Sequence, residues 1–254
     1  MKNQKREEFP FLPALFTLTN ALFGFLSLVF CFQGRYAWSA LWIFMAAITD
    51  SLDGIVARFL DRQSEFGVQL DSLVDAFSFG AATAMLLYFW GLAAVHTAGV
   101  FFGFVFLASA ILRLARYNVL QKTQKSRKHY VGLTAPSGAL FLVSFVFLHP
   151  QPLLERWQAF VLALAIVVVS FLMVSKVRYP NLLYFEPRRK ISLSSALLVA
   201  ILIAGFVFYT RLFLFAFFSF NLLLGPGAYF FQIFKIKRRN RLTQKNLSND
   251  SAIH

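Results

Sequence analysis

The sequence predicts an all-α, polytopic integral membrane protein with about eight transmembrane helices and both termini in the cytoplasm. Three observations lead to this prediction: the composition, the recurring apolar runs and the distribution of positive charge. The 254-residue chain is 58% hydrophobic, contains 33 Phe and has a mean hydropathy of +0.63, whereas soluble chains are roughly 45–50% apolar. Apolar runs of about 20 residues, long enough for a helix to cross a bilayer, recur along nearly the whole chain.

The apolar runs predict the helices in chain order. The first run follows the charged start MKNQKREEF, is longer than the apolar region of a signal peptide and holds no small-residue cleavage site, so we expect an uncleaved helix. The polar turn DRQSEF separates the second run from the third, and a tight turn near 209–211 separates the last two. The expected spans lie near residues 11–32, 37–60, 67–90, 96–116, 134–149, 156–175, 192–209 and 212–234. They form one membrane domain, 11–234, between a cytoplasmic tail, 1–10, and a basic cytoplasmic tail, 235–254.

The positive charge predicts the orientation and argues against a nucleic-acid partner. Lys and Arg number 25 against 11 Asp and Glu, which gives a formal net charge of +14. With both termini inside, all of these cations except Arg35, Arg156 and Arg211 fall on the cytoplasmic side, which is the positive-inside pattern. If the last two spans were one feature, the basic C-terminal tail would break this pattern. The basic surface suits anionic lipid headgroups. The single cysteine, Cys31, excludes an intrachain disulfide.

Four aspartates lie in the second and third runs, where ionised carboxylates are costly. One such group at the centre of a membrane helix costs about 2.5–3.5 kcal/mol on insertion scales. Since a helix turns about 100° per residue, the spacing gathers these residues on one face of each helix. The faces carry Asp50, Asp53, Gly54 and Ala57 on the second helix, and Gly67, Asp71 and Asp75 on the third. An antiparallel hairpin brings the two faces together near the cytoplasmic end.

This acidic cluster predicts a divalent metal site. Four carboxylates packed together repel one another unless cations lie between them, and oxygen ligands suit Mg²⁺ or Mn²⁺. Two such ions about 3.5–4 Å apart are a known device for displacement at phosphorus. Glycine within a helix costs about 1 kcal/mol, so Gly54 and Gly67 indicate close approach of a flat base or a pyrophosphate. Arg58, one turn after Asp53, offers a planar donor fork to a phosphate.

The spacing resembles the signature of the CDP-alcohol phosphotransferase family, D-x2-D-G-x2-A-R-x8-G-x3-D-x3-D, at every defined position. The resemblance implies transfer of a phosphate-linked group from a CDP-activated donor to a hydroxyl, with release of CMP. It implies that Asp50, Asp53 and Asp71 bind metal, with two ions expected, and that Asp75 completes the second metal site and serves as the base. The residues implied to lie against CDP are Gly54, Ala57, Arg58 and Gly67.

Flanking segments are similar to the membrane-embedded phosphatidylserine synthases within this family. The similar segments, which cover about residues 11–182, are LPALFTLTNALFGF (12–25), DSLVDAFSFG (71–80), RLARYNV (113–119) and LMVSKVRYP (172–180). One departure is Thr134, where the subfamily usually has proline. The resemblance implies CDP-diacylglycerol and L-serine as substrates and phosphatidylserine and CMP as products. It also implies a homodimer and, for a bacterial source, the inner membrane, with the active site facing the cytoplasm.

The acceptor pocket has several candidate residues. Arg113 and Arg116, three apart at the cytoplasmic end of the fourth span, offer cations to the serine carboxylate or to the lipid phosphate, or anchor the helix at the membrane surface. Tyr117 and Asn118 add hydrogen-bonding groups. Thr17 and Asn20, polar residues in the first span, take part either in helix–helix hydrogen bonds or in the nucleotide site.

Other functions stay open from the sequence. Within the family, the acceptor is alternatively glycerol 3-phosphate, inositol phosphate or choline. Outside the family, acidic residues within the membrane also occur in cation transporters. A further alternative is that the four aspartates only form a structural ion-pair network with Arg58 and Arg62. Clustering of all four aspartates in one hairpin, beside two glycines and Arg58, favours the enzyme.

Overall fold

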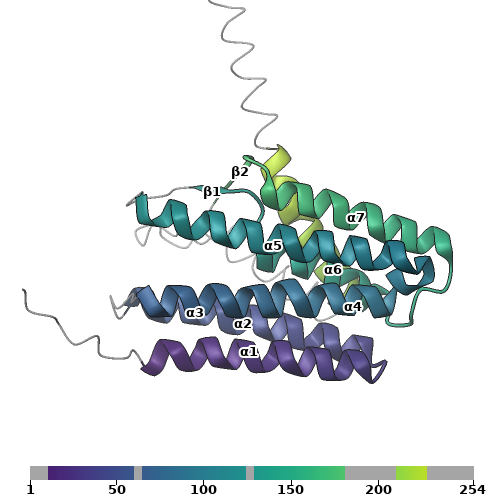
Figure 1. The fold of residues 1–254 in the computed structure, drawn as a ribbon, viewed down its shortest axis with the longest axis horizontal. Helices are drawn as coiled ribbons and strands as arrows, with labels where there is room; N and C mark the ends of the chain where they lie inside the picture. Colours follow the sequence, from purple (N-terminus) through teal and green to yellow (C-terminus); the bar gives the residue numbers. More distant parts are fainter. Residues whose placement is uncertain (1–10, 60–64, 124–128, 181–209, 228–254) are drawn as a thin grey trace, which may run out of the picture.

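The computed structural model describes residues 11–59, 65–123, 129–180 and 210–227, and it is helical except for one two-stranded ribbon within those residues (Figure 1). The expected span at 192–209 and both tails lie outside the described residues. The helices are α1 (Phe11–Phe32), α2 (Tyr36–Phe59), α3 (Glu65–Asp75), the π-helix η1 (Ala76–Ala82), α4 (Thr83–Trp90), the 3₁₀-helix η2 (Leu92–Val95), α5 (Thr97–Thr123), α6 (Ala135–Leu148), α7 (Arg156–Val174) and an unlabelled helix, Thr210–Gly227.

The helices run roughly side by side along the long axis of the molecule. In Figure 1, α1, α2 and the continuous helix α3–η1–α4 lie on one side, with α5 and α7 on the other. The π-helix η1 contacts α1, α5 and α6, so it lies at the centre of the bundle. Gly34, which has a φ of +72°, allows the tight turn between α1 and α2.

Within the described residues, five helices are long and apolar enough to cross a membrane: Ala14–Phe32, Glu65–Trp90, Thr97–Leu120, Arg156–Val174 and Thr210–Gly227. The expected span at 134–149 corresponds to the shorter apolar helix α6. The span at 37–60 corresponds to α2, which is long enough but less apolar because it carries Asp50, Asp53 and Arg58. The all-helical architecture, with helices suited to crossing a membrane, is thus confirmed, while the number of eight spans and the side of the termini stay predictions.

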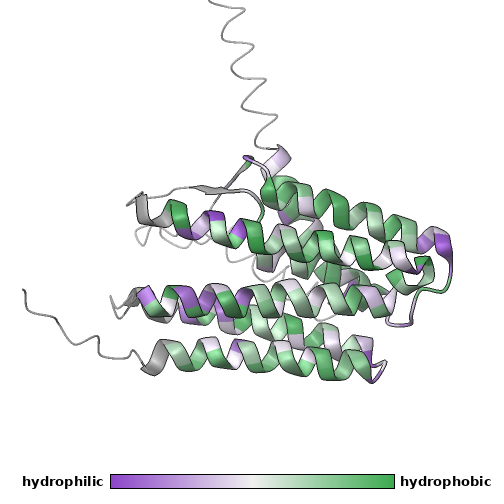
Figure 2. Ribbon diagram, in the orientation of Figure 1, coloured by the Kyte–Doolittle hydropathy of each residue, from purple (hydrophilic) through white to green (hydrophobic). Residues whose placement is uncertain are grey.

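Hydrophilic residues are concentrated in one part of an otherwise apolar bundle. Figure 2 shows green, hydrophobic residues along most helices and purple, hydrophilic residues on α3 and on the C-terminal half of α5. Outward-facing side chains such as Phe104 and Phe171 are exposed, which suits contact with lipid tails. The hydrophilic region on α3 and α5 is therefore the candidate location of the functional site.

The ribbon of strands β1 (His129–Val131) and β2 (Arg178–Pro180) was not expected from the sequence. The strands pair antiparallel, with Tyr130 opposite Tyr179, and connect the chain after α5 to the chain after α7. The Tyr179 hydroxyl donates to the Leu222 carbonyl oxygen at 3.3 Å, and a Cβ on Gly225 would collide with the Tyr179 ring. The ribbon thereby anchors the helix Thr210–Gly227.

At Thr134, the departure from the usual proline has a local structural role. Thr134 is the N-cap of α6, and its hydroxyl accepts a hydrogen bond from the Ser137 amide at 3.3 Å. Threonine is a favourable N-cap because its oxygen pairs with an amide that the helix leaves free. With threonine instead of proline at this position, the chain loses the backbone restriction that proline imposes and gains a side-chain cap on α6.

Candidate active site

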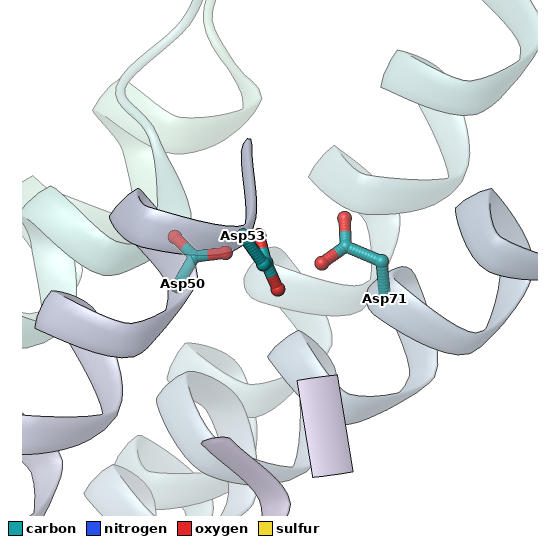
Figure 3. Close-up of side chains that lie close together, drawn as sticks. All are labelled: Asp50, Asp53 and Asp71. Atoms are coloured by element: carbon teal, nitrogen blue, oxygen red, sulfur yellow. The ribbon is translucent and has the colours of Figure 1, made fainter. Parts of the chain in front are cut away.

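Three aspartate side chains converge between α2 and α3. Carboxylate oxygens of Asp50, Asp53 and Asp71 lie within 4.8 Å of one another, and Figure 3 shows all three side chains pointing into one space. Asp50 and Asp53 come from one face of α2, and Asp71 reaches them from the neighbouring helix. This is the arrangement that the helical spacing predicts for an antiparallel hairpin.

The fourth aspartate lies directly beside this group. Asp75, the last residue of α3, is buried, and its carboxylate is within electrostatic range of Asp50, Asp71 and Asp53. The amide of Asn20 donates to Asp75 Oδ1 at 3.5 Å. Asp75 is therefore part of the cluster but is held by a neighbour from α1.

Helix α1 contributes both of its predicted polar residues to this site. Thr17 donates to Asp53 Oδ2 at 3.4 Å, and Asn20 contacts Asp75. The backbone oxygen of Asn20 also accepts a hydrogen bond from the Ser78 hydroxyl at 3.2 Å. Both residues thus make helix–helix hydrogen bonds to the candidate metal ligands, and their contact with a nucleotide stays a prediction.

Arg113 places a positive charge at the cluster. Its side chain is only 8% exposed, and its guanidinium is within electrostatic range of Asp50 and Asp75. It also lies over the ring of Tyr117, at 5.5 Å from the centroid, where a cation–π contact is favourable. Arg113 is therefore a buried group of the site.

Arg116 points to a different part of the molecule. Its guanidinium donates to three carbonyl oxygens at the end of α7: Val174 at 2.6 Å, Ser175 at 3.1 Å and Met173 at 3.3 Å. Although Arg113 and Arg116 are close in sequence, the structure does not bring them to the same group.

Asn118 connects α5 to α3 next to the cluster. Its amide nitrogen donates to the Ser72 hydroxyl at 2.8 Å, and the same hydroxyl lies 3.1 Å from the Asn118 oxygen. Ser72 follows Asp71 directly, so this pair supports the helix segment that carries a candidate metal ligand.

The remaining predicted residues lie at the edge of the described site. Gly54, Ala57 and Arg58 belong to the last two turns of α2, but their side-chain surroundings are outside what the structure describes. Gly67 is partly buried in the first turn of α3. Their contact with CDP remains a prediction.

Two serines and a glycine near the site had no role in the sequence-based interpretation. Ser72 and Ser78 both lie in the segment DSLVDAFSFG, and their match to the subfamily pattern was the available signal. Gly24 lies against Ser78, where an added Cβ would collide with the hydroxyl. These residues hold α1, α3 and α5 together around the aspartates.

The donor set fits a hard divalent cation. Carboxylate oxygens from two helices converge on one space, and Mg²⁺ and Mn²⁺ prefer such ligands. The convergence of the charges, in a bundle that buries them, is best explained by a cation that neutralises them.

Comparison with known proteins identifies the family. The family model for CDP-alcohol phosphatidyltransferase matches residues 10–175, and the chain belongs to this family. It is 32% identical over 171 residues to a CDP-diacylglycerol–serine O-phosphatidyltransferase of Helicobacter pylori, which covers 66% of this chain and 71% of that protein.

Two further relatives cover similar parts of the chain. The archaetidylserine synthase of Methanothermobacter thermautotrophicus is 34% identical over 185 residues, 71% of this chain and 74% of that protein. The CDP-diacylglycerol–serine O-phosphatidyltransferase of Bacillus subtilis is 29% identical over 171 residues, which cover 67% of this chain and 90% of that protein. The family resemblance stated from the sequence is confirmed by these matches.

Proposed function

We propose that this protein transfers the phosphatidyl group of CDP-diacylglycerol to the hydroxyl of L-serine, giving phosphatidylserine and CMP, at a site facing the cytoplasm. The observation that supports this most strongly is the convergence of Asp50, Asp53 and Asp71, with Asp75 and Arg113 beside them. Membership of the family supports the reaction class. The names of the relatives support serine as the acceptor.

The four aspartates divide into two roles. Asp50, Asp53 and Asp71, with Asp75 at their edge, would hold Mg²⁺ or Mn²⁺, which would supply charge neutralisation for the pyrophosphate oxygens. Asp75 accepts the proton of the serine hydroxyl as that oxygen forms a bond to the β-phosphorus. The bond from phosphorus to the CMP oxygen breaks, and CMP leaves with the electron pair. Asn20 orients the Asp75 carboxylate through its amide.

Arg113 is suited to hold the acceptor. The α-carboxylate of serine needs a cationic partner near Asp75, and a buried guanidinium is a strong donor to a carboxylate. Arg113 occupies this position on α5, on the side of Asp50 and Asp75. Arg113 thus binds the serine carboxylate, and the phosphates of CDP-diacylglycerol are bound on the metal-binding side of the site, together with Arg58.

The proposal is tested by CMP release from the purified protein with CDP-diacylglycerol and Mn²⁺ or Mg²⁺. The acceptors compared are L-serine, glycerol 3-phosphate, inositol phosphate, choline and none. We expect CMP release that depends on serine and on metal. Release with a different acceptor would keep the family and refute serine, and an absence of release from folded protein under all conditions would refute the enzyme.

A further inference from the structure

We infer that Arg116 is a positioning residue that joins α5 to the C-terminal end of α7 and so holds Arg113 at the acidic cluster. The inference rests on the proposed function, in which Arg113 binds the acceptor. From the sequence, both Arg113 and Arg116 are candidates for binding a substrate anion. Their side chains separate among the described residues: Arg113 lies in electrostatic range of Asp50 and Asp75, whereas Arg116 bonds carbonyl oxygens at the end of α7.

Arg116 completes the hydrogen bonding of the end of α7. A helix leaves its last carbonyl oxygens without partners within the helix. The Ser175 amide bonds the Phe171 oxygen, and the Leu133 amide bonds the Leu172 oxygen at 3.1 Å. The next three carbonyl oxygens, 173–175, accept from the Arg116 guanidinium. A cation at this place also interacts favourably with the negative end of the helix dipole.

Gly132 makes the same junction tight from another side. Its φ of +81° favours glycine, and its amide donates to the Val177 carbonyl oxygen at 2.8 Å. An added Cβ would lie 2.5 Å from the Met173 oxygen and 2.8 Å from Arg116 Nη2. Arg116, Gly132 and the end of α7 therefore form one closely packed junction, which we call the α5–α7 joint.

The α5–α7 joint affects the position of Arg113, the proposed acceptor-binding residue, more than the positions of the metal-binding aspartates. Arg113 lies on the turn of α5 that precedes Arg116, so a shift of α5 moves its guanidinium relative to Asp50 and Asp75. The metal-binding aspartates lie on α2 and α3, and α1 supports these helices through Thr17 and Asn20. Asn118 of α5 also bonds Ser72 beside Asp71, but the hydrogen bonds from α1 to Asp53 and Asp75 do not depend on α5. Loosening the joint is therefore expected to weaken serine binding and to leave metal binding in place.

The experiment measures steady-state kinetics of Arg116→Gln and Gly132→Ala against wild type in the full-length protein. For both variants we expect the KM for serine to rise about tenfold, with kcat within about twofold and the Mn²⁺ half-saturation unchanged. Gly132 carries no functional group that binds a substrate, so an effect of Gly132→Ala on the serine KM reports the geometry of the joint. The two variants disturb the joint independently, and a thermal unfolding curve shows which of them is folded.

Lys176→Gln is the matched control, because it removes an exposed cation two residues after the end of α7. We expect wild-type KM values from it. An unchanged serine KM in a folded Arg116→Gln or Gly132→Ala variant would overturn the inference. So would a rise in the KM for CDP-diacylglycerol confined to Arg116→Gln, because it would indicate direct contact between Arg116 and a substrate phosphate.

The wild-type assay separates this inference from the proposed function. If wild type releases CMP with an acceptor other than serine, the serine proposal fails, and the KM for that acceptor becomes the readout for the joint. If wild type uses serine and neither variant changes its KM, the joint inference fails and the proposed function stands.

Discussion

Asp75 differs from the other aspartates in its neighbours. Both Asp53 and Asp75 accept a hydrogen bond from α1, but the donor to Asp53 is the Thr17 hydroxyl, whereas the donor to Asp75 is the Asn20 amide. Hydrogen bonding from a neutral amide orients a carboxylate without adding charge, and a proton acceptor in catalysis must keep such an orientation. The surroundings of Asp75 therefore favour the role of base, in addition to its place beside the metal ligands.

For Asp75→Asn, we expect kcat to fall by about 10²–10⁴, the range attributed to a general base. The amide keeps the size of the side chain but does not accept the serine proton. The measurement is CMP release at saturating Mn²⁺. Glu155→Gln, which changes an exposed acid at the other end of α7, should retain wild-type activity. A kcat within tenfold of wild type for Asp75→Asn would remove Asp75 from the role of base.

Replacing Asn20 tests the orientation of this base. Asn20→Leu keeps the branching at Cγ but removes the amide that donates to Asp75, and a hydrogen bond to a charged group is worth about 1.5–3 kcal/mol. We expect kcat/KM to fall by about 10–100-fold. Thr19→Val is the control on the same helix, because the Thr19 hydroxyl bonds only locally, to the Leu15 carbonyl oxygen among the contacts described. Equal losses in both variants would point to damage to α1.

At the scale of elements, the π-helix η1 joins the site to the bundle core. It begins directly after Asp75 and contains Ser78, whose hydroxyl bonds the backbone of α1. A π-helix changes the direction of the residues that follow it, and such segments are frequent at functional sites. Here the π-helix begins between two residues that both contact Asn20 on α1, Asp75 through its carboxylate and Ser78 through its hydroxyl.

Gly24 allows α1 to lie this close to η1. In Gly24→Ala, the new Cβ would collide with the Ser78 hydroxyl, and overpacking of this kind costs about 1–3 kcal/mol. We expect a lower unfolding temperature in detergent micelles, with partial recovery on adding Ser78→Ala. The matched control is Gly103→Ala, because its Cβ would meet the Ala84 oxygen at an ordinary 3.7 Å. Equal stability of Gly24→Ala and Gly103→Ala would contradict the close packing described here.

Metal binding is expected to stabilise the hairpin of α2 and α3. A ligand that binds only the folded protein adds about 2.7 kcal/mol at a concentration 100 times its Kd. Mn²⁺ should therefore raise the unfolding temperature of wild type, and EDTA should reverse the rise. Asp71→Asn removes the ligand that α3 gives to the three-carboxylate group, so its unfolding temperature should respond weakly to Mn²⁺. A full response in Asp71→Asn would place the ion elsewhere.

At the scale of the whole molecule, features that follow local rules were predictable from the sequence. The convergence of Asp50, Asp53 and Asp71 follows from helical periodicity within one hairpin. The contacts of Arg116 with 173–175 and the pairing of Asn118 with Ser72 join segments 46 to 59 residues apart. No spacing rule connects such distant segments. The π-helix was also missed, because its winding departs from the period on which the prediction relied.

The expected orientation in the membrane depends on how the positive charges are divided between the two ends of the bundle. The described end of the bundle that holds the acidic cluster also carries Arg113, Arg116 and Lys176, whereas the α1–α2 turn at the opposite end carries Arg35 (Figure 1). Under the positive-inside rule, we expect the first of these ends to face the cytoplasm. A cytoplasmic site would draw serine and metal ions from the cytoplasm.

Single cysteines test this orientation in a Cys31→Ser background, which removes the one native thiol. Gln33→Cys lies in the exposed α1–α2 turn, and Lys176→Cys lies in an exposed position after α7. In intact cells we expect a membrane-impermeant maleimide to label Gln33→Cys, and to label Lys176→Cys only after permeabilisation. Labelling of both after permeabilisation is the internal control, because it shows that each thiol is accessible. Labelling of Lys176→Cys in intact cells would invert the topology and place the acidic cluster outside, where CDP-diacylglycerol made in the cytoplasmic leaflet and cytoplasmic serine would not reach it.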